Sequence, residues 1–173
     1  MVEGAEGRSG ALAEIGGDVG TGKTTLAMLI SAEALRHSLS VAIYSLPRLL
    51  GLLRETFDDE SEASLGVLLD RLAAVDLLHI DDVGAEQSSP WVLEQLYTIV
   101  NTRYEDRRAI VITTNLDEAE LREQIGERTV SRLVEMCGDP LLLCGADHRK
   151  EFELPESGPA PYGEPPRSAR AGW

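Results

Sequence analysis

Apolar and polar positions along the 173-residue chain follow two alternating patterns. Short apolar runs bounded by polar residues predict buried strands, and longer segments with apolar residues at every third or fourth position predict helices. We expect strands at residues 11–15, 41–44, 75–80, 109–114 and 140–144. We expect helices at residues 24–37, 47–57, 65–74, 90–104, 118–125 and 127–137. Strands and helices that alternate in this way predict an α/β fold, with one parallel sheet covered by helices on both faces.

Composition divides the chain into one domain with an extension at each end. Residues 11–154 hold all of the periodic segments and form the expected domain, whose length suits a single hydrophobic core. Residues 1–10 are expected to be a flexible N-terminus. Residues 155–173 contain five prolines and three glycines, a composition typical of disordered segments.

The formal net charge of −14 argues against indiscriminate binding to nucleic acid, because such binding depends on contacts of lysine and arginine with phosphates. A local basic strip is still compatible with this charge. No apolar run approaches the roughly 20 residues that a membrane-spanning helix needs, and the first residues lack the pattern of a secretory signal. We therefore expect a cytoplasmic protein in which Cys137 and Cys144, each within an apolar segment, are buried free thiols.

One motif indicates a bound phosphate. Residues 17–24, GDVGTGKT, match the pattern GxxxxGK[ST] completely and lie between an expected strand and an expected helix. The glycines let the backbone curl so that its N–H groups point inward as a nest for phosphate oxygens. Lys23 would add a charge for the β- and γ-phosphates, and the Thr24 hydroxyl would ligate Mg²⁺.

Polar residues follow two other expected strands. Asp81 and Asp82 end the third apolar run, where α/β sheets place their ligands. Asp81 would hold Mg²⁺, directly or through water, and Asp82 would position the attacking water. Asn115, after Thr113 and Thr114, can orient a water or donate to phosphate without adding negative charge. His79 lies inside the same apolar run as the acids, so we expect it to be buried and hydrogen-bonded rather than catalytic.

Three longer segments resemble a known family. They are residues 80–104 (IDDVGAEQSSPWVLEQLYTIVNTRY), 112–137 (ITTNLDEAELREQIGERTVSRLVEMC) and 44–57 (YSLPRLLGLLRETF). Together with the phosphate motif they resemble the DnaC-type bacterial helicase loaders, which are AAA+ ATPases. The related IstB-type transposition helper ATPases share the pattern more loosely. The likeness covers about residues 12–152.

The resemblance implies a P-loop NTPase three-layer sandwich with the strand order 5-1-4-3-2 and an ATP site that a neighbouring subunit completes. Too few residues follow Met136 for the usual helical lid, so we expect the lid domain to be lacking or vestigial. The resemblance assigns Asp81 and Asp82 as Walker B and Asn115 as sensor 1. It assigns as the Walker A loop Gly17, Asp18, Val19, Gly20, Thr21, Gly22, Lys23, Thr24 and Thr25.

The resemblance also implies an arginine finger, which reaches the γ-phosphate of an adjacent subunit. In the sequence SRL, Arg132 occupies its place, and Arg128, four residues earlier on the same helical face, is the second candidate. The alternative is that Arg132 pairs with Glu135 on a solvated helix. A finger provided in trans contributes on the order of 10³-fold or more to turnover, so we expect an isolated monomer to hydrolyse ATP weakly.

Other charged residues have two interpretations each. In initiators and loaders an extra helical element faces single-stranded DNA between the second and third strands, where Arg48, Arg54 and Arg71 are the basic candidates here. Their alternative is ordinary solvated charge. Glu86 is either a second acid of the site or a structural residue. Arg149 is either a sensor 2 residue or a charged residue at a strand end.

Loaders place a helicase-binding region, and a segment that helps enclose the adenine, ahead of their phosphate loop. Only one short strand is expected ahead of GDVGTGKT in this sequence. We therefore expect that those parts are lost by truncation or divergence, or that another chain supplies them.

These features predict a cytoplasmic, Mg²⁺-dependent AAA+ ATPase that acts in DNA replication as a helicase-loader-like protein. Lys23 and Mg²⁺ would stabilise charge, Asp82 and Asn115 would arrange the water, and Arg132 would act across a subunit interface. The implied partners are further copies or a full-length loader, a replicative helicase and single-stranded DNA, with no membrane.

Two alternatives stay open. One is an IstB-type transposition helper ATPase with a transposase and duplex DNA as partners. The other is a truncated nucleotide-binding regulatory module without turnover. A small-molecule kinase is least favoured, because neither an arginine-rich phosphate lid nor an acceptor site is evident.

Overall fold

The computed structural model describes residues 14–58, 62–84, 89–145 and 147, and the features below belong to this part of the chain. The expected flexible N-terminus (1–10), the expected disordered tail (155–173) and the two candidates Glu86 and Arg149 lie outside the described residues.

Five parallel strands form one sheet in the order β2-β3-β4-β1-β5. They are β1 (Glu14–Gly17), β2 (Val41–Ser45), β3 (Leu77–Val83), β4 (Ala109–Thr114) and β5 (Leu141–Leu143). Read from the other edge, this is the order 5-1-4-3-2, so the expected fold class is confirmed.

Two strands continue further than their apolar residues. β3 reaches Val83, so Asp81 and Asp82 lie inside the strand rather than after it. β1 reaches Gly17, the first residue of the phosphate motif. Backbone pairing continues because a neighbouring strand is present, with Gly17 opposite Leu143 and Val83 opposite Thr114. The apolar pattern therefore placed the strands but not their polar ends.

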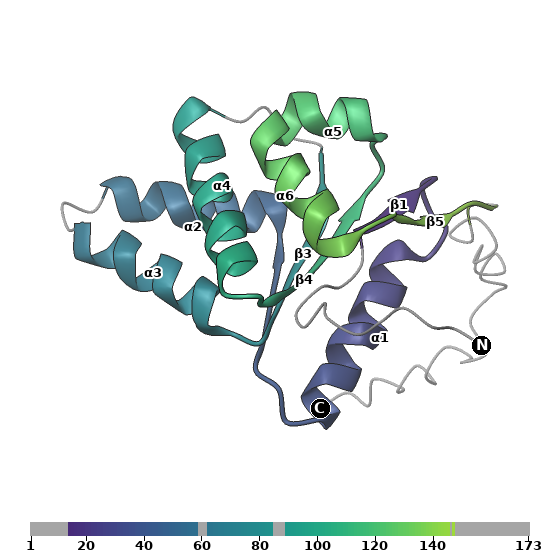
Figure 1. Ribbon diagram of the computed structural model, residues 1–173, viewed down its shortest axis with the longest axis horizontal. Helices are drawn as coiled ribbons and strands as arrows, with labels where there is room; N and C mark the ends of the chain where they lie inside the picture. Colours follow the sequence, from purple (N-terminus) through teal and green to yellow (C-terminus); the bar gives the residue numbers. More distant parts are fainter. Residues whose placement is uncertain (1–13, 59–61, 85–88, 146, 148–173) are drawn as a thin grey trace, which may run out of the picture.

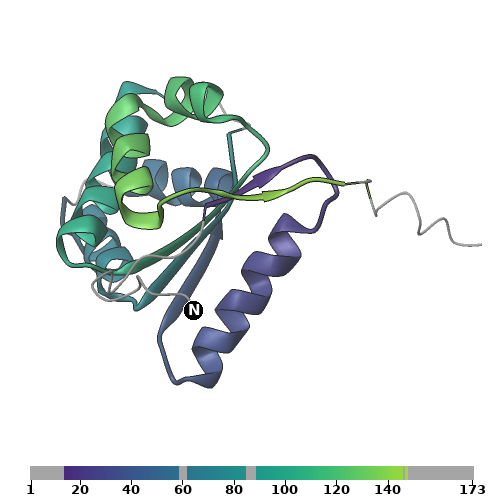
Figure 2. The ribbon, with the colours of Figure 1, turned by 45° about the vertical axis from the view of Figure 1, so that its right-hand side comes forward.

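Helices cover both faces of the sheet. They are α1 (Lys23–Arg36), α2 (Leu46–Asp58), α3 (Glu62–Ala74), α4 (Pro90–Glu105), α5 (Glu118–Ile125) and α6 (Glu127–Cys137). Figures 1 and 2 show α1 alone on one face and α2 to α6 on the other. The three-layer arrangement expected from the alternation of elements is therefore present.

Each face of the sheet has its own core, because successive residues of a strand point to opposite faces. Leu78 and Ile80 of β3 pack with α2 to α6 in the larger core. Leu77 and Val111 pack with α1 in the smaller one. This second core fixes α1 against the centre of the sheet, so the loop that leads into α1 lies over the carboxyl ends of the strands.

The two cysteines differ in exposure. Both are free thiols, but Cys137 is half-buried and Cys144 is exposed. The expectation of buried thiols is wrong for Cys144, because β5 is an edge strand that ends at Leu143.

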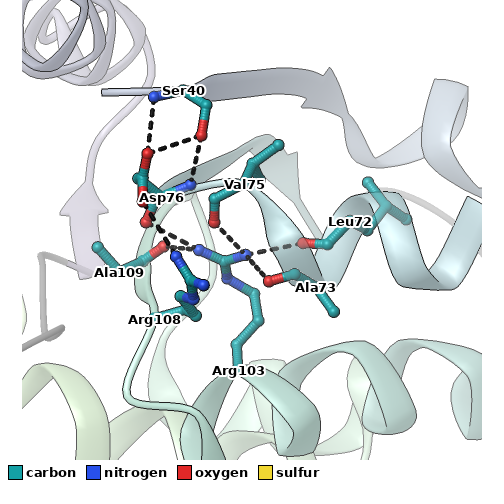
Figure 3. A network of polar contacts seen from close by, with 8 residues as sticks. All are labelled: Ser40, Leu72, Ala73, Val75, Asp76, Arg103, Arg108 and Ala109. Atoms are coloured by element: carbon teal, nitrogen blue, oxygen red, sulfur yellow. Dashed lines mark hydrogen bonds and ion pairs between the residues drawn. The ribbon is translucent and has the colours of Figure 1, made fainter. Parts of the chain in front are cut away.

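A buried guanidinium connects the strands at their amino ends (Figure 3). Arg103 of α4 is fully buried, and its burial lowers the pKa of the side chain to about 10, which leaves it charged at neutral pH. Its two terminal nitrogens donate to five main-chain carbonyls, of Leu72 at 2.7 Å, Ala73 at 3.2 Å, Val75 at 3.0 Å, Asp76 at 3.1 Å and Ala109 at 2.5 Å. These carbonyls belong to the end of α3 and the starts of β3 and β4.

The carboxylate of Asp76 extends this network to a third strand. It accepts hydrogen bonds from the backbone nitrogen and hydroxyl of Ser40, at 2.9 and 2.7 Å, and from Arg108 at 3.0 Å. The Ser40 hydrogen bonds are the main cause of the lowered pKa of Asp76. Each of these three residues directly precedes a strand: Ser40 precedes β2, Asp76 precedes β3 and Arg108 precedes β4. The network therefore sets the relative positions of the three strands.

We predict that Arg103→Ala lowers the free energy of unfolding by about 3–5 kcal/mol, because it leaves five buried carbonyls without their donor. Denaturant unfolding measures the loss. Arg36→Ala is the control, since its side chain is 81% exposed and its removal changes stability by less than about 0.5 kcal/mol. A loss below about 1 kcal/mol for Arg103→Ala would show that the carbonyls find other partners.

Candidate functional site

A cavity of about 460 Å³ opens at the carboxyl ends of β1, β3 and β4. It is lined by Val19, Gly20, Gly22, Lys23, Thr24, Thr25, Asp81, Asp82, Thr113, Thr114 and Asn115. The structure thus gathers residues from all three motifs around one space. The remaining loop residues proposed for Walker A, Gly17, Asp18 and Thr21, belong to the same loop but do not line the cavity.

Two glycines of the loop are required by close packing. Gly17 has a φ of 128°, and a Cβ there would lie 2.0 Å from the carbonyl oxygen of Leu143. Gly20 has a φ of 78°, and a Cβ there would lie 1.8 Å from a carboxylate oxygen of Asp147. Both backbone conformations favour glycine. The loop therefore packs closely against β5 and Asp147.

Lys23 is folded back onto its own loop. Its side chain is buried, and the ammonium donates to the main-chain carbonyls of Gly17 at 2.7 Å and Asp18 at 2.5 Å. These bonds keep the charge of Lys23 at the mouth of a loop built to surround phosphate. A phosphate bound there would compete with the two carbonyls for the hydrogen bonds that the Lys23 ammonium donates.

The two proposed metal ligands contact each other directly. The Thr24 hydroxyl donates to the Asp81 carboxylate, at 3.0 Å to one oxygen and 3.2 Å to the other. Mg²⁺ prefers oxygen ligands and is commonly held by one or two protein groups, waters and substrate phosphates. No group of three or more His, Cys, Asp or Glu side chains gathers among the described residues. The metal roles of Thr24 and Asp81 stay predictions.

A bulge in β3 presents the second acid to the cavity. The pairing of β3 with β4 shifts between Ile80 and Val83, and Asp82 has a φ of 59°. Such bulges turn a side chain out of the regular alternation of a strand. The turned Asp82 is exposed, and its carboxylate accepts a hydrogen bond of 3.3 Å from the side-chain amide of Asn115. The residues proposed to arrange water are thus neighbours.

Thr113 holds both acids, and its role was missed in the sequence. Its buried hydroxyl donates to Asp81 at 2.6 Å and accepts from the backbone nitrogen of Asp82 at 2.9 Å. The next residue, Thr114, donates to the carbonyl of Val83 at 2.6 Å. Two threonines ahead of an asparagine were visible in the sequence, but only the bulge in β3 places the Thr113 hydroxyl against the acids.

His79 lies beside Asp81 on the α1 side of the sheet. Its Nδ1 lies 3.0 Å from the hydroxyl of Ser31, which is also 2.9 Å from the carbonyl of Ala27. Its Nε2 lies 3.8 Å from the Asp81 carboxylate. Burial lowers the pKa of His79, in keeping with the neutral form. The expectation of a buried, hydrogen-bonded histidine is confirmed.

The candidate arginine fingers lie on α6, away from the residues that line the cavity. Arg132 forms an ion pair of 3.1 Å with Glu135, as one of the two interpretations of the sequence expected. It also donates to Asn101 at 3.3 Å. Arg128 is exposed. A role for either arginine in an adjacent subunit stays a prediction.

The candidate DNA-facing arginines lie on two helices at one side of the molecule (Figure 1). Arg48 and Arg54 are on α2 and Arg71 is in the last turn of α3, and all three are exposed. Their exposure fits both of the interpretations that the sequence left open.

Most of the chain matches one family of known proteins. Residues 10–135 match the family described as IstB-like ATP binding protein. The chain belongs to this family. The family's description agrees with a nucleotide in the cavity, while the roles of single residues stay predictions.

Curated relatives carry the name replicative helicase loader DnaC. The protein from Buchnera aphidicola subsp. Schizaphis graminum is 32% identical over 117 residues, which are 68% of this chain and 48% of the relative. The Escherichia coli (strain K12) protein is 33% identical over 117 residues, 68% of this chain and 47% of the relative. The chain therefore spans about half the length of the curated relatives it matches.

A solved structure agrees with these relatives. The crystal structure of the DnaC helicase loader matches with a TM-score of 0.69 at 25% identity, over 79% of this chain and 80% of that chain. The resemblance to loaders seen in the sequence is thus confirmed at the level of family and fold. In the described part of the chain, no helix is long and apolar enough to cross a membrane.

We predict that Thr113→Val weakens Mg²⁺-dependent binding of ATP by roughly tenfold or more, because the Asp81 carboxylate loses a donor and the backbone N–H of Asp82 loses its acceptor. Titration of a fluorescent ATP analogue with Mg²⁺ and with EDTA measures the effect. Thr113→Ser, which keeps the hydroxyl, should restore binding. Unchanged Mg²⁺-dependent affinity in a folded Thr113→Val protein would contradict the positioning role.

Proposed function

We propose that the chain is the ATPase core of a Mg²⁺-dependent AAA+ protein that acts in DNA replication in the manner of a helicase loader. The observation that carries the proposal is that residues of three separate motifs line one cavity. The phosphate loop, the Thr24–Asp81 pair and the Asp82–Asn115 pair all face the space where a triphosphate would extend.

Hydrolysis would transfer the γ-phosphoryl group to water. The water oxygen bonds to the γ-phosphorus, and the bond to the bridging oxygen breaks, which gives ADP and inorganic phosphate. Lys23 would donate to phosphate oxygens, while Asp82 and Asn115 would accept from and orient the water. Thr24 and Asp81 would hold Mg²⁺, whose contribution is to neutralise charge on the β- and γ-phosphates.

The site would be completed by a second subunit. Arg132, or Arg128 in second place, would reach the γ-phosphate of a neighbouring copy or of a full-length loader. The described residues of the cavity include one basic side chain, Lys23, which supports a need for a further cation from elsewhere. On this proposal an isolated monomer hydrolyses ATP weakly.

The relatives' names support a replicative helicase as a partner. We further propose that single-stranded DNA is reached through the exposed arginines of α2 and α3, and that the protein acts in the cytoplasm. The family match supports a second candidate, a transposition helper that works with a transposase and duplex DNA. A nucleotide-binding module without turnover is the third candidate, because the cavity and the family's description support nucleotide binding without bearing on turnover.

We predict that Asp82→Asn keeps ATP binding within about threefold and lowers turnover by roughly 10²-fold or more, because the amide cannot polarise the attacking water as a carboxylate does. Steady-state release of phosphate and equilibrium binding measure the two quantities separately. Lys23→Ala is the control that should lose binding as well. Hydrolysis by Asp82→Asn at the wild-type rate would remove Asp82 from the mechanism.

A second prediction separates the candidate functions. Tagged Asp82→Asn protein, which should hold ATP without cleaving it, is expected to capture a replicative helicase from its native cell with ATP and Mg²⁺, and not with Lys23→Ala. Mass spectrometry identifies the captured proteins. Capture of a transposase would favour the transposition helper instead, and capture of neither would favour the regulatory module.

A further inference from the structure

The guanidinium of Arg132 is enclosed by three side chains that do not line the nucleotide cavity. Its Nε donates to Asn101 at 3.3 Å, and its Nη1 donates to Glu135 at 3.1 Å. Its central carbon lies 4.3 Å from the centre of the Tyr104 ring, within the range of a cation–π contact. We call Asn101, Tyr104 and Glu135 the arginine cage. Two of its members lie on α4 and one on α6.

The cage is itself held together. A hydrogen bond from the Tyr104 hydroxyl to Glu135 is the main cause of the raised pKa of Tyr104 and of the lowered pKa of Glu135, so Glu135 is ionised at neutral pH. The Tyr97 hydroxyl donates to Asn101 at 3.4 Å. The Arg132 side chain is 34% exposed, so the cage encloses it only in part.

These contacts exceed those of an ordinary ion pair on a helix surface. A single exposed pair three residues apart contributes little and breaks easily. Here an aromatic face and a second hydrogen bond act on the same guanidinium, so the contacts support each other. Arg132 therefore has one preferred place in the isolated chain.

That place opposes action on a phosphate. Glu135 neutralises the charge that would stabilise a γ-phosphate, and its own negative charge would repel that phosphate at close range. The donors that face Asn101 and Glu135 are also engaged. Arg132 can act fully on a neighbouring nucleotide only after it has left the carboxylate.

We propose that the arginine cage stows Arg132 in the isolated chain, and that release from Glu135 limits hydrolysis of ATP bound to a neighbouring copy. The inference rests on the proposed function, in which Arg132 acts in trans. It adds an autoinhibitory contact that α4 and α6 impose on the finger. If the cage inhibits the finger, weakening the cage raises the rate of ATP hydrolysis in trans. If the cage instead positioned the finger for catalysis, weakening the cage would lower that rate.

The test mixes two variants, one with a defective finger and the other with a defective ATP site. Arg132→Ala protein supplies an intact ATP site, and Lys23→Ala protein supplies an intact finger. Hydrolysis by the mixture, above the sum of the two alone, reports Arg132 in trans. Adding Glu135→Gln to the Lys23→Ala protein should raise this excess rate by roughly three- to tenfold, because the guanidinium loses its anionic partner. Adding Tyr104→Phe should raise it less, because the ring remains.

The matched control is Glu33→Gln in the same Lys23→Ala background. Glu33 forms an ion pair with Arg36 at a spacing of three residues on α1, as Glu135 does with Arg132 on α6. This control should leave the excess rate unchanged. Unfolding midpoints of all variants show that the proteins compared are folded.

The outcomes separate the two proposals. An excess rate that Glu135→Gln leaves unchanged, or lowers, would overturn the cage as an inhibitory contact while keeping Arg132 as a finger. No excess rate in the mixture, either with or without Glu135→Gln, would overturn the finger, and the stowing proposal with it. A rise with Glu135→Gln and none with Glu33→Gln supports both.

Discussion

The buried guanidinium of Arg103 is the contact on which the arrangement of the sheet depends. Its five carbonyl partners end one helix and begin two strands, and the adjoining Asp76 carboxylate ties in a third strand through Ser40. Buried carbonyls need donors, and one planar side chain supplies them all. With the strands fixed at their amino ends, their carboxyl ends meet in a constant register. The cavity is built on that far edge.

Much of the fold and of the cavity was predictable from the sequence. The periodic segments located the helices and strands that the structure describes, and the strand order followed from the resemblance to loaders. Local signals sufficed there, because apolar spacing and loop glycines act within a few residues. Most of the expected loop lines one cavity together with the acids and Asn115, although the part each plays in catalysis is still a prediction.

The remaining features depend on contacts between distant parts of the chain. The bulge at Asp82 needs a neighbouring strand whose pairing shifts, and Thr113 acts only because that shift brings it opposite Asp81. Arg103 reads in the sequence as one more charged residue of a helix, yet it is fully buried. The partners of Arg132 on α4 lie about 30 positions away in the chain, beyond the reach of helical spacing.

The folded-back Lys23 has a consequence for selectivity among anions. Two carbonyls of the loop already accept hydrogen bonds from the Lys23 ammonium, so they would compete with a phosphate for this donor. An incoming anion must replace those bonds, so a small anion with few contacts gains little from entering. On the proposed function, a triphosphate would compensate with further contacts along the loop and at Thr24. The loop would then discriminate by the number of phosphates as well as by charge, and inorganic phosphate alone would bind weakly.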